Sequence, residues 1–100
     1  MMEYYLICYD ICDNKKRTKL AQYLRKMGFR RIQKSVFIGR IKSKKSVLLV
    51  QELSLLIEFP CDSLIVMPIS QTVVGNTAII GQGNEKLVWL KSQSPLTNFL

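Results

Sequence analysis

Residues 4–10, Tyr-Tyr-Leu-Ile-Cys-Tyr-Asp, form an almost continuous run of apolar and aromatic side chains that ends in a carboxylate. A run of this length and composition predicts a strand that is buried on both faces. Such a strand needs a layer of structure on each side of its sheet. This requirement is demanding, because a chain of 100 residues forms one domain and has few elements to spare.

Helix and strand patterns alternate after this first strand. Asp13 and Asn14 are N-cap candidates for a helix over residues 15–27, and Gly28 suits the left-handed position that ends it. The further elements that the patterns predict are a strand over 32–39, a helix over 44–58, a strand over 64–69, and short strands over 77–80 and 85–90.

This order of elements predicts an α+β fold, a ferredoxin-like β-α-β-α-β sandwich with both helices on one face of the sheet. The other face then needs a cover, and a second copy of the chain is the simplest one. We expect residues 1–90 to form this single domain and residues 91–100 to form a loosely ordered tail.

The positive charge of the chain is concentrated in its first half. Residues 1–45 contain thirteen of the fifteen Lys and Arg side chains and three acidic ones, a net charge of +10. Residues 46–100 contain two cationic and four acidic side chains, a net charge of −2. A dense field of one sign attracts polyanions, which favours a surface for phosphate backbones. A solubilising face explains the charge alone equally well.

The chain contains no histidine. Imidazole acid–base pairs, Ser-His-Asp and Cys-His triads and histidine-ligated metals are therefore excluded. Any catalysis must use carboxylates, metal-activated water, Tyr, Lys or Cys.

The three cysteines, Cys8, Cys12 and Cys61, are odd in number and lack paired C-x-x-C spacing. This pattern argues against a disulfide framework and against a zinc site. We therefore expect reduced thiols, with Cys8 and Cys61 as small core residues. The chain also lacks an apolar stretch of membrane-spanning length and a secretory signal, so we expect a cytoplasmic protein with no membrane partner.

Asp10 is the sharpest candidate for chemistry, because a buried strand delivers its carboxylate into a strand-to-helix turn in a cationic region. Mg²⁺ is usually held by one or two carboxylates together with substrate phosphates, so a single Asp is a poor site. A two-fold axis past the strand ends would let Asp10 of two chains share one ion. The alternative role for an Asp before a helix is a cap. We assign the cap to Asp13 and the metal to Asp10.

Cationic side chains on both sides of the second strand are candidates for contacts with a phosphate backbone, Arg by bidentate bonds and Lys as point charges. These nucleic-acid-binding candidates are Lys15, Lys16, Arg17, Lys19, Arg30, Arg31, Lys42, Lys44 and Lys45. No base-reading signature accompanies them. We expect Phe37 to be a core or dimer residue rather than a base-stacking platform, and Gly81-Gln82-Gly83 to be a turn rather than a phosphate loop.

The first half of the chain closely resembles the CRISPR-associated protein two family. The residues that carry the resemblance are Tyr9-Asp10-Ile11, Asp13, Arg17, Leu24, Gly28 and then Gln33-Lys34-Ser35-Val36-Phe37-Ile38-Gly39. Asp62-Ser63 and Ile80-Gly81 resemble later landmarks of the family in layout. Cys12 departs from the pattern, since many members have Pro or Ser there.

The resemblance implies a ferredoxin-like homodimer whose sheets face each other, with an additional C-terminal β-strand that pairs across the dimer. It implies Mg²⁺- or Mn²⁺-dependent cleavage of RNA or double-stranded DNA, with Asp10 as the metal ligand. It also implies a role in spacer acquisition, as the dimer that bridges subunits of the CRISPR integrase, CRISPR-associated protein one. The family's catalytic positions correspond to Asp10, Tyr9, Arg17, Arg31 and Phe37, and Lys19 stands where the family can have Arg.

Three functions remain open at this point. The first is a nuclease, in which Asp10 acts with a metal while Arg17 and Arg31 steady the phosphate. The second is a dimeric scaffold that holds spacer DNA without cutting it. The third, a small-molecule regulatory domain, predicts no strongly cationic half and is disfavoured by the charge of residues 1–45.

Overall fold

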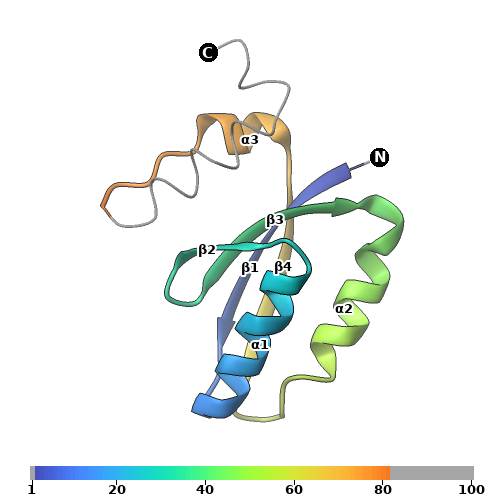
Figure 1. Ribbon diagram of the computed structural model, residues 1–100, viewed down its shortest axis with the longest axis vertical. Helices are drawn as coiled ribbons and strands as arrows, with labels where there is room; N and C mark the ends of the chain where they lie inside the picture. The colour runs from blue at the N-terminus through green and yellow to red at the C-terminus, as the bar shows by residue number, and fades with distance from the viewer. Residues whose placement is uncertain (1, 82–100) are drawn as a thin grey trace.

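The computed structural model describes residues 2–81, and Figure 1 shows α1 and α2 side by side against one sheet. The elements are β1 (Met2–Asp10), α1 (Asn14–Lys26), β2 (Arg30–Gln33), β3 (Val36–Lys42), a 3-10 turn (Ser43–Lys45), α2 (Ser46–Ser54), β4 (Ser63–Ile69) and α3 (Gln71–Asn76). The strand order is β2-β3-β1-β4, with every neighbouring pair antiparallel. The predicted ferredoxin-like α+β fold is confirmed. The strand predicted over 85–90, its pairing across a dimer and the tail over 91–100 lie outside the described residues.

β1 is central in the sheet and is buried from both sides, as its composition predicts. Tyr5, Ile7 and Tyr9 face the helices, because they belong to the core cluster that also contains the buried residues of α1 and α2. The alternate residues Tyr4 and Leu6 belong to a second cluster on the other face, where Val74 of α3 packs against them. Successive side chains of a strand point to opposite faces, so this assignment holds along the whole of β1.

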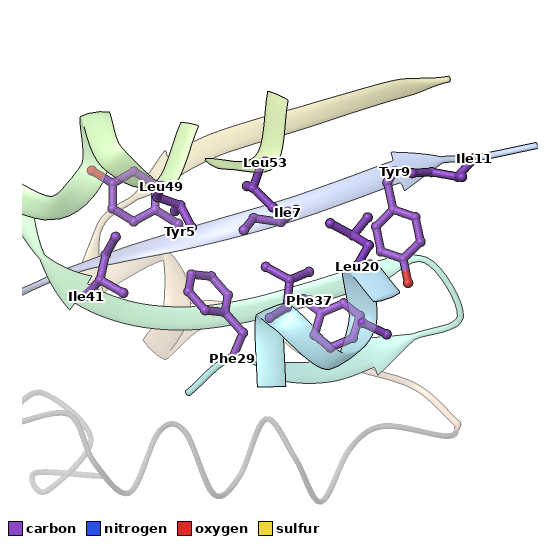
Figure 2. Close-up of a cluster of buried hydrophobic side chains, with 12 residues drawn as sticks. Tyr5, Ile7, Tyr9, Ile11, Leu20, Phe29, Phe37, Ile41, Leu49 and Leu53 are labelled. Atoms are coloured by element: carbon purple, nitrogen blue, oxygen red, sulfur yellow. The ribbon is translucent and has the colours of Figure 1, made fainter. Parts of the chain in front are cut away.

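The main core lies between the sheet and the two long helices (Figure 2). Figure 2 shows Leu49 of α2 beside Tyr5 and Leu53 of α2 beside Ile7. Leu20 of α1 and Phe37 belong to the same cluster, and each of Ile7, Leu20, Phe37, Leu49 and Leu53 is at most 1% exposed. This core fixes the position of β1 and of the two loops that leave its end, where the candidate site lies.

The predicted ends of the first helix are confirmed by their hydrogen bonds. The Asp13 carboxylate accepts a hydrogen bond from the Lys16 amide at 3.0 Å, which is an N-cap. At the other end Gly28 has a φ of 90°, and the Phe29 amide donates to the carbonyl of Leu24 at 2.9 Å. Only glycine adopts this backbone conformation without a steric cost, so α1 ends at the position that the sequence predicts.

One hydrogen bond joins the two long helices, from the Tyr23 hydroxyl of α1 to the Glu52 carboxylate of α2. Burial and this bond raise the pKa of Tyr23 to about 12 from an ordinary value of 10.0. The folded protein therefore disfavours the ionised phenol. The stabilisation by Tyr23 is complete below pH 10.0 and is lost as the pH rises through about 12.

We predict that Tyr23→Phe lowers the free energy of unfolding by about 1 kcal/mol near neutral pH, because the Glu52 carboxylate loses its donor. The difference between the two proteins should shrink between pH 10.0 and about 12, where the wild-type phenol ionises beside Glu52. Urea unfolding across this range measures both free energies. If the free energy of unfolding fell equally in both proteins over this pH range, the raised pKa of Tyr23 would be contradicted.

The second predicted strand is a β-hairpin rather than one strand over 32–39. β2 and β3 pair through Arg30↔Ile38 and Arg31↔Phe37, with Lys34 and Ser35 as the turn between them. Two-residue hairpin turns usually show Asn-Gly or Asp-Gly, because those residues accept positive φ. No non-glycine residue in the described range has positive φ. Lys34-Ser35 therefore gave no turn signal in the sequence.

Two further predictions are corrected after β3. The helix predicted over 44–58 is shorter, because Ser43–Lys45 form a 3-10 turn and α2 ends at Ser54. The strand predicted over 77–80 is absent from the described residues, and the helix α3 precedes it. Ser70 caps α3 by accepting a hydrogen bond from the Val73 amide at 3.1 Å, and Val74 is fully buried. Burial of Val74 thus outweighs the turn signal of Gly75 and Asn76.

The expectation of three reduced cysteines is wrong, since Cys12 and Cys61 form a disulfide with their Cα atoms 6.2 Å apart. Cys61 is exposed rather than a core residue, and Cys8 is a free, half-buried thiol in β1. The cysteines are 49 residues apart in sequence and meet only because β1 and β4 are neighbours. Spacing in the sequence contained no sign of this pairing. Among residues 2–81, no helix is long and apolar enough to cross a membrane.

Candidate functional site

Asp10 is the last residue of β1, and its side chain is exposed on the face of the sheet away from α1 and α2. Tyr9 faces the helices, and the next residue must point to the opposite side. The register places Asp10 across from Ser63, the first residue of β4. We call the sheet face that α1 and α2 do not cover the open face. The Asp10 carboxylate lies at one end of this face, in the strand-to-loop position that the sequence predicts.

Tyr9, Phe37 and Arg31 form a contiguous group on the helix-facing side of the sheet. The rings of Tyr9 and Phe37 stack with centroids 6.1 Å apart, and the Arg31 guanidinium carbon lies 5.2 Å from the Phe37 centroid. Figure 2 shows the first two side chains next to each other below β1. Phe37 is fully buried, as expected for a core residue, and it also supports the cation above it.

Arg17 joins this group from the first turns of α1. Its guanidinium donates a hydrogen bond at 2.6 Å to the carbonyl of Ile11, in the loop that follows Asp10. Arg17 therefore fixes the path of the chain between the acidic residue and the helix.

A polar cavity of about 250 Å³ opens beside Tyr9, between α1 and the turn of the hairpin. Three of its lining side chains are cationic, namely Arg17, Arg31 and Lys34, and none is acidic. Asn14, Thr18 and Ser35 add further polar atoms. The Nε atom of Arg31 is buried and has no hydrogen-bond partner among the described residues. This combination of charge and donors suits an anion of the phosphate class.

Four of the five predicted catalytic residues are thus close together, and Asp10 is separated from them by the sheet. Tyr9, Arg17, Arg31 and Phe37 lie on the helix side, while Asp10 faces the open side. The two groups meet only at the end of β1. A ligand that touches both must pass around this end.

The remaining cationic candidates do not form one patch. Lys15, Lys16 and Lys19 lie on α1 but do not line the cavity, and Lys16 pairs with Glu58. Arg30 faces the open side, because it pairs with Ile38 of the second cluster. Lys42, Lys44 and Lys45 lie at the far end of the sheet, since Lys42 pairs with Met2 at the start of β1. At about 3.3 Å per strand residue, Lys42 is about 26 Å from Asp10 along the direction of β1.

Four lining residues of the cavity are not among the site residues that the sequence predicts, namely Asn14, Thr18, Lys34 and Ser35. Asn14 and Thr18 share one face of α1 with Arg17, at the helical spacings i, i+3 and i+4. That spacing was available in the sequence as a signal. Lys34 and Ser35 reach the cavity through the hairpin turn, which gave no signal.

The acidic residues near Asp10 differ in what their carboxylates already bind. Asp13 caps α1. Asp62 is 6% exposed and accepts hydrogen bonds from the amides of Cys12 at 3.1 Å and Glu58 at 2.9 Å. These two bonds lower the pKa of Asp62, so it remains ionised in a structural role. Asp10 is the acid of this group that faces solvent without a cap or loop role.

The Asp10 carboxylate is a suitable Mg²⁺ ligand, but Asp10 of one chain alone supplies too few ligands to hold the ion. Carboxylate oxygen is a preferred ligand of Mg²⁺. In the described part of the chain, the one group of three potential metal ligands is Cys12, Cys61 and Asp62, which does not include Asp10. A site at Asp10 therefore needs the second carboxylate of another chain or the phosphates of a substrate.

The chain matches the model of a known protein family. The family described as CRISPR associated protein Cas2 matches residues 2–77. The CRISPR-associated endoribonuclease Cas2 of Korarchaeum cryptofilum is 36% identical over 78 residues, which cover 78% of this chain and 84% of that protein. The protein of the same description from Aeropyrum pernix is 48% identical over 56 residues, which cover 53% of this chain and 61% of that protein.

Two further similarities concern architecture. A CRISPR-associated endonuclease Cas1/endonuclease Cas2 fusion of Thermoproteus tenax is 45% identical over 38 residues, 38% of this chain and 14% of that protein. The crystal structure of a hypothetical protein, TT1823, from Thermus thermophilus superposes with a TM-score of 0.68 at 27% identity. This similarity covers 81% of the chain and 93% of that protein.

Proposed function

Because the chain belongs to the CRISPR-associated Cas2 family, we propose that it binds nucleic-acid phosphate backbones in CRISPR adaptation and cleaves phosphodiester bonds in a metal-dependent reaction. The observation that carries this proposal is the cationic cavity of Arg17, Arg31 and Lys34 beside the end of β1, where Asp10 is exposed. A phosphate group fits the cavity in charge and donors, and the strand end brings an acidic group near it.

Binding rests on the cavity. Arg31 is held above Phe37, so its guanidinium is oriented before a ligand arrives. A bidentate contact from a pre-oriented Arg costs less side-chain entropy than one from a free chain. Lys34 is exposed at the hairpin turn and adds a point charge. Lys15 and Lys19 add exposed positive charge on another face of α1.

In this proposal cleavage takes place in a homodimer, since Asp10 is the one exposed acid of the described loops that has no cap or loop role. The exposed Ile65 and Met67 of β4, at 55% and 46%, support a partner on the open face, which is also the face of Asp10. Two Asp10 carboxylates at the two-fold axis would hold one Mg²⁺, or Mn²⁺, which activates water and stabilises charge at the phosphate. Arg17 keeps the loop after Asp10 in place through the Ile11 carbonyl. Arg31 steadies the phosphate of the bound strand.

A non-catalytic scaffold is the second candidate. The similarity to a Cas1/Cas2 fusion supports an integrase partner, because fused chains assemble with a fixed stoichiometry. In this role the dimer bridges subunits of CRISPR-associated protein one and holds spacer DNA in the cytoplasm. The same cationic cavity would then contact the duplex, and Asp10 would have no chemical task.

Removal of two cavity cations tests the binding role. We predict that Arg31→Gln/Lys34→Gln weakens duplex binding on the order of tenfold or more, because charge-assisted hydrogen bonds to phosphate are lost. The slope of log K against log salt should fall in magnitude by about 1.8, or about 0.9 per lost phosphate contact.

The matched control is Arg25→Gln/Lys26→Gln, which removes the same charge from exposed positions at the end of α1. Fluorescence anisotropy with labelled duplex DNA and RNA over a salt series measures both variants. Equal losses of duplex affinity in the two double variants would show that the cavity contributes no more than any other pair of positive charges. A wild type that binds neither duplex at low salt would refute the proposed function.

A further inference from the structure

The loop after Asp10 is joined to a second loop at two points, and the first turn of α1 adds a third contact. These segments are residues 11–13, between β1 and α1, and residues 55–62, between α2 and β4. Cys12 and Cys61 form a disulfide, and the Cys12 amide donates to the Asp62 carboxylate at 3.1 Å. Lys16, in the first turn of α1, forms an ion pair with Glu58.

The disulfide lies where it can influence the candidate active site. Cys12 follows Asp10 by two residues and directly precedes Asp13, the cap of α1. The backbone here is held on one side by the sheet and on the other by the Asp13 cap. A covalent bond from Cys12 to Cys61 therefore limits the motion of the segment that connects Asp10 to α1, the helix that carries Arg17.

Cys12 and Cys61 are both exposed, whereas Cys8 is a free thiol that is half-buried in β1. A buried structural disulfide is protected from thiols in solution, but an exposed one is open to exchange. In reducing compartments, disulfides of this kind usually act as redox-sensing bonds rather than permanent ones. The cytoplasmic role proposed above makes this distinction important.

We propose that Cys12 and Cys61 form a redox-reversible disulfide that fixes the loop following Asp10 when oxidised and releases it when reduced. Asp62 prevents complete separation of the loops in the reduced state, because its carboxylate binds the amides of Cys12 and Glu58 independently of the sulfur atoms. The reduced protein therefore keeps its fold and gains motion at the end of β1.

The exchange reaction uses a low-molecular-weight disulfide such as oxidised glutathione as the oxidant. One cysteine thiolate attacks this disulfide, forms a mixed disulfide and releases one small thiol. The second cysteine thiolate then attacks the mixed disulfide, closes the Cys12–Cys61 bond and releases the second small thiol. Two electrons pass from the two cysteines to the oxidant, and the two protons of the cysteine thiols end on the two released thiols.

The first experiment equilibrates the protein in buffers of varied ratio of reduced to oxidised glutathione and counts free thiols by alkylation and mass spectrometry. We expect one free thiol, Cys8, at the oxidising end and three at the reducing end, with a reversible transition between them. The melting temperature should fall by about 10 °C on reduction, because the bond closes a long loop of the unfolded chain.

The variants Cys12→Ser and Cys61→Ser should each melt near the temperature of reduced wild type under both conditions. Cys8→Ser is the matched control and should keep the full redox response. Amide hydrogen exchange at Cys12 and Asp13 should accelerate on reduction of wild type and of Cys8→Ser only.

Three results would overturn the proposal. The first is three free thiols at every glutathione ratio, and the second is a disulfide that cannot be reduced in the folded protein. The third is amide hydrogen exchange at Cys12 and Asp13 whose rate is the same in both redox states. One zinc ion per chain, retained in the reduced protein with Cys12 and Cys61 unreactive, would make these residues and Asp62 a metal site instead.

A last measurement rests on the proposed function. If the loop controls Asp10, cleavage by wild type and by Cys8→Ser should change severalfold between the two redox states, and cleavage by Cys12→Ser should not. A protein that cleaves nothing refutes the nuclease but leaves the thiol and exchange results standing. Redox-independent cleavage with a reversible bond would refute the link to Asp10 alone.

Discussion

Replacement of Asp10 by Asn should lower metal-dependent cleavage on the order of a hundredfold or more, while duplex binding stays within a factor of about two. The amide retains the shape of the side chain but removes the charge that a divalent cation requires. Asp10 is exposed at the end of β1, so the exchange should leave the melting temperature unchanged. Cleavage assays of labelled RNA and duplex DNA, with Mg²⁺ and with a chelator, measure the effect.

The control variant is Glu3→Gln, which removes an exposed acid from the opposite end of β1. It should cleave like wild type. Cleavage by Asp10→Asn at the wild-type rate would place the chemistry elsewhere. If wild type binds duplex but cuts nothing with Mg²⁺ or Mn²⁺, the scaffold role is the correct one.

Gly39→Ala should lower the free energy of unfolding by about 3 kcal/mol, the upper part of the range for overpacked cores. Gly39 is in the middle of β3, opposite Tyr5, and the ring of Phe29 packs directly onto its backbone. An added Cβ would lie 2.5, 2.7 and 2.8 Å from three ring carbons of Phe29. Phe29 is 1% exposed, so the ring has no free space into which to move.

Gly75→Ala provides the matched control, because nothing lies within 4 Å of its added Cβ. Gly75 belongs to α3, where Ala is favoured over Gly by up to about 1 kcal/mol, so this variant should be unchanged or more stable. Urea unfolding of both variants gives the comparison. Wild-type stability of Gly39→Ala would show that the contact between Phe29 and the strand is looser than described.

The elements with strong periodic patterns were predictable from the sequence, and those defined by tertiary contacts were not. β1 and α1 have a buried run, a cap at Asp13 and a left-handed end at Gly28, so local chemistry alone specifies them. The hairpin turn at Lys34-Ser35 and the helix α3 lack such signals. They depend on pairing with β1 and on burial of Val74, which no local window contains.

The candidate site divides in the same way. Asp10 was identifiable because a carboxylate at the end of an apolar strand is unusual, and Arg17 because it follows the cap closely. The charge beside the second strand pointed to Arg31, whereas the family resemblance pointed to Tyr9 and Phe37. Their mutual contacts and the contribution of Lys34 become visible only when β2 folds back on β3. The disulfide between Cys12 and Cys61 likewise required two distant loops to meet.

Tyr9 and Asp10 are neighbours in sequence whose side chains leave the sheet in opposite directions. A mononucleotide that fills the cavity beside Tyr9 would therefore not reach the acid of the same chain. Binding in the cavity and cleavage at Asp10 should therefore require substrates of different minimum length. Only an oligonucleotide long enough to pass around the end of β1 contacts both the cavity and Asp10. Short fragments would then be competitive inhibitors that the protein holds without hydrolysing.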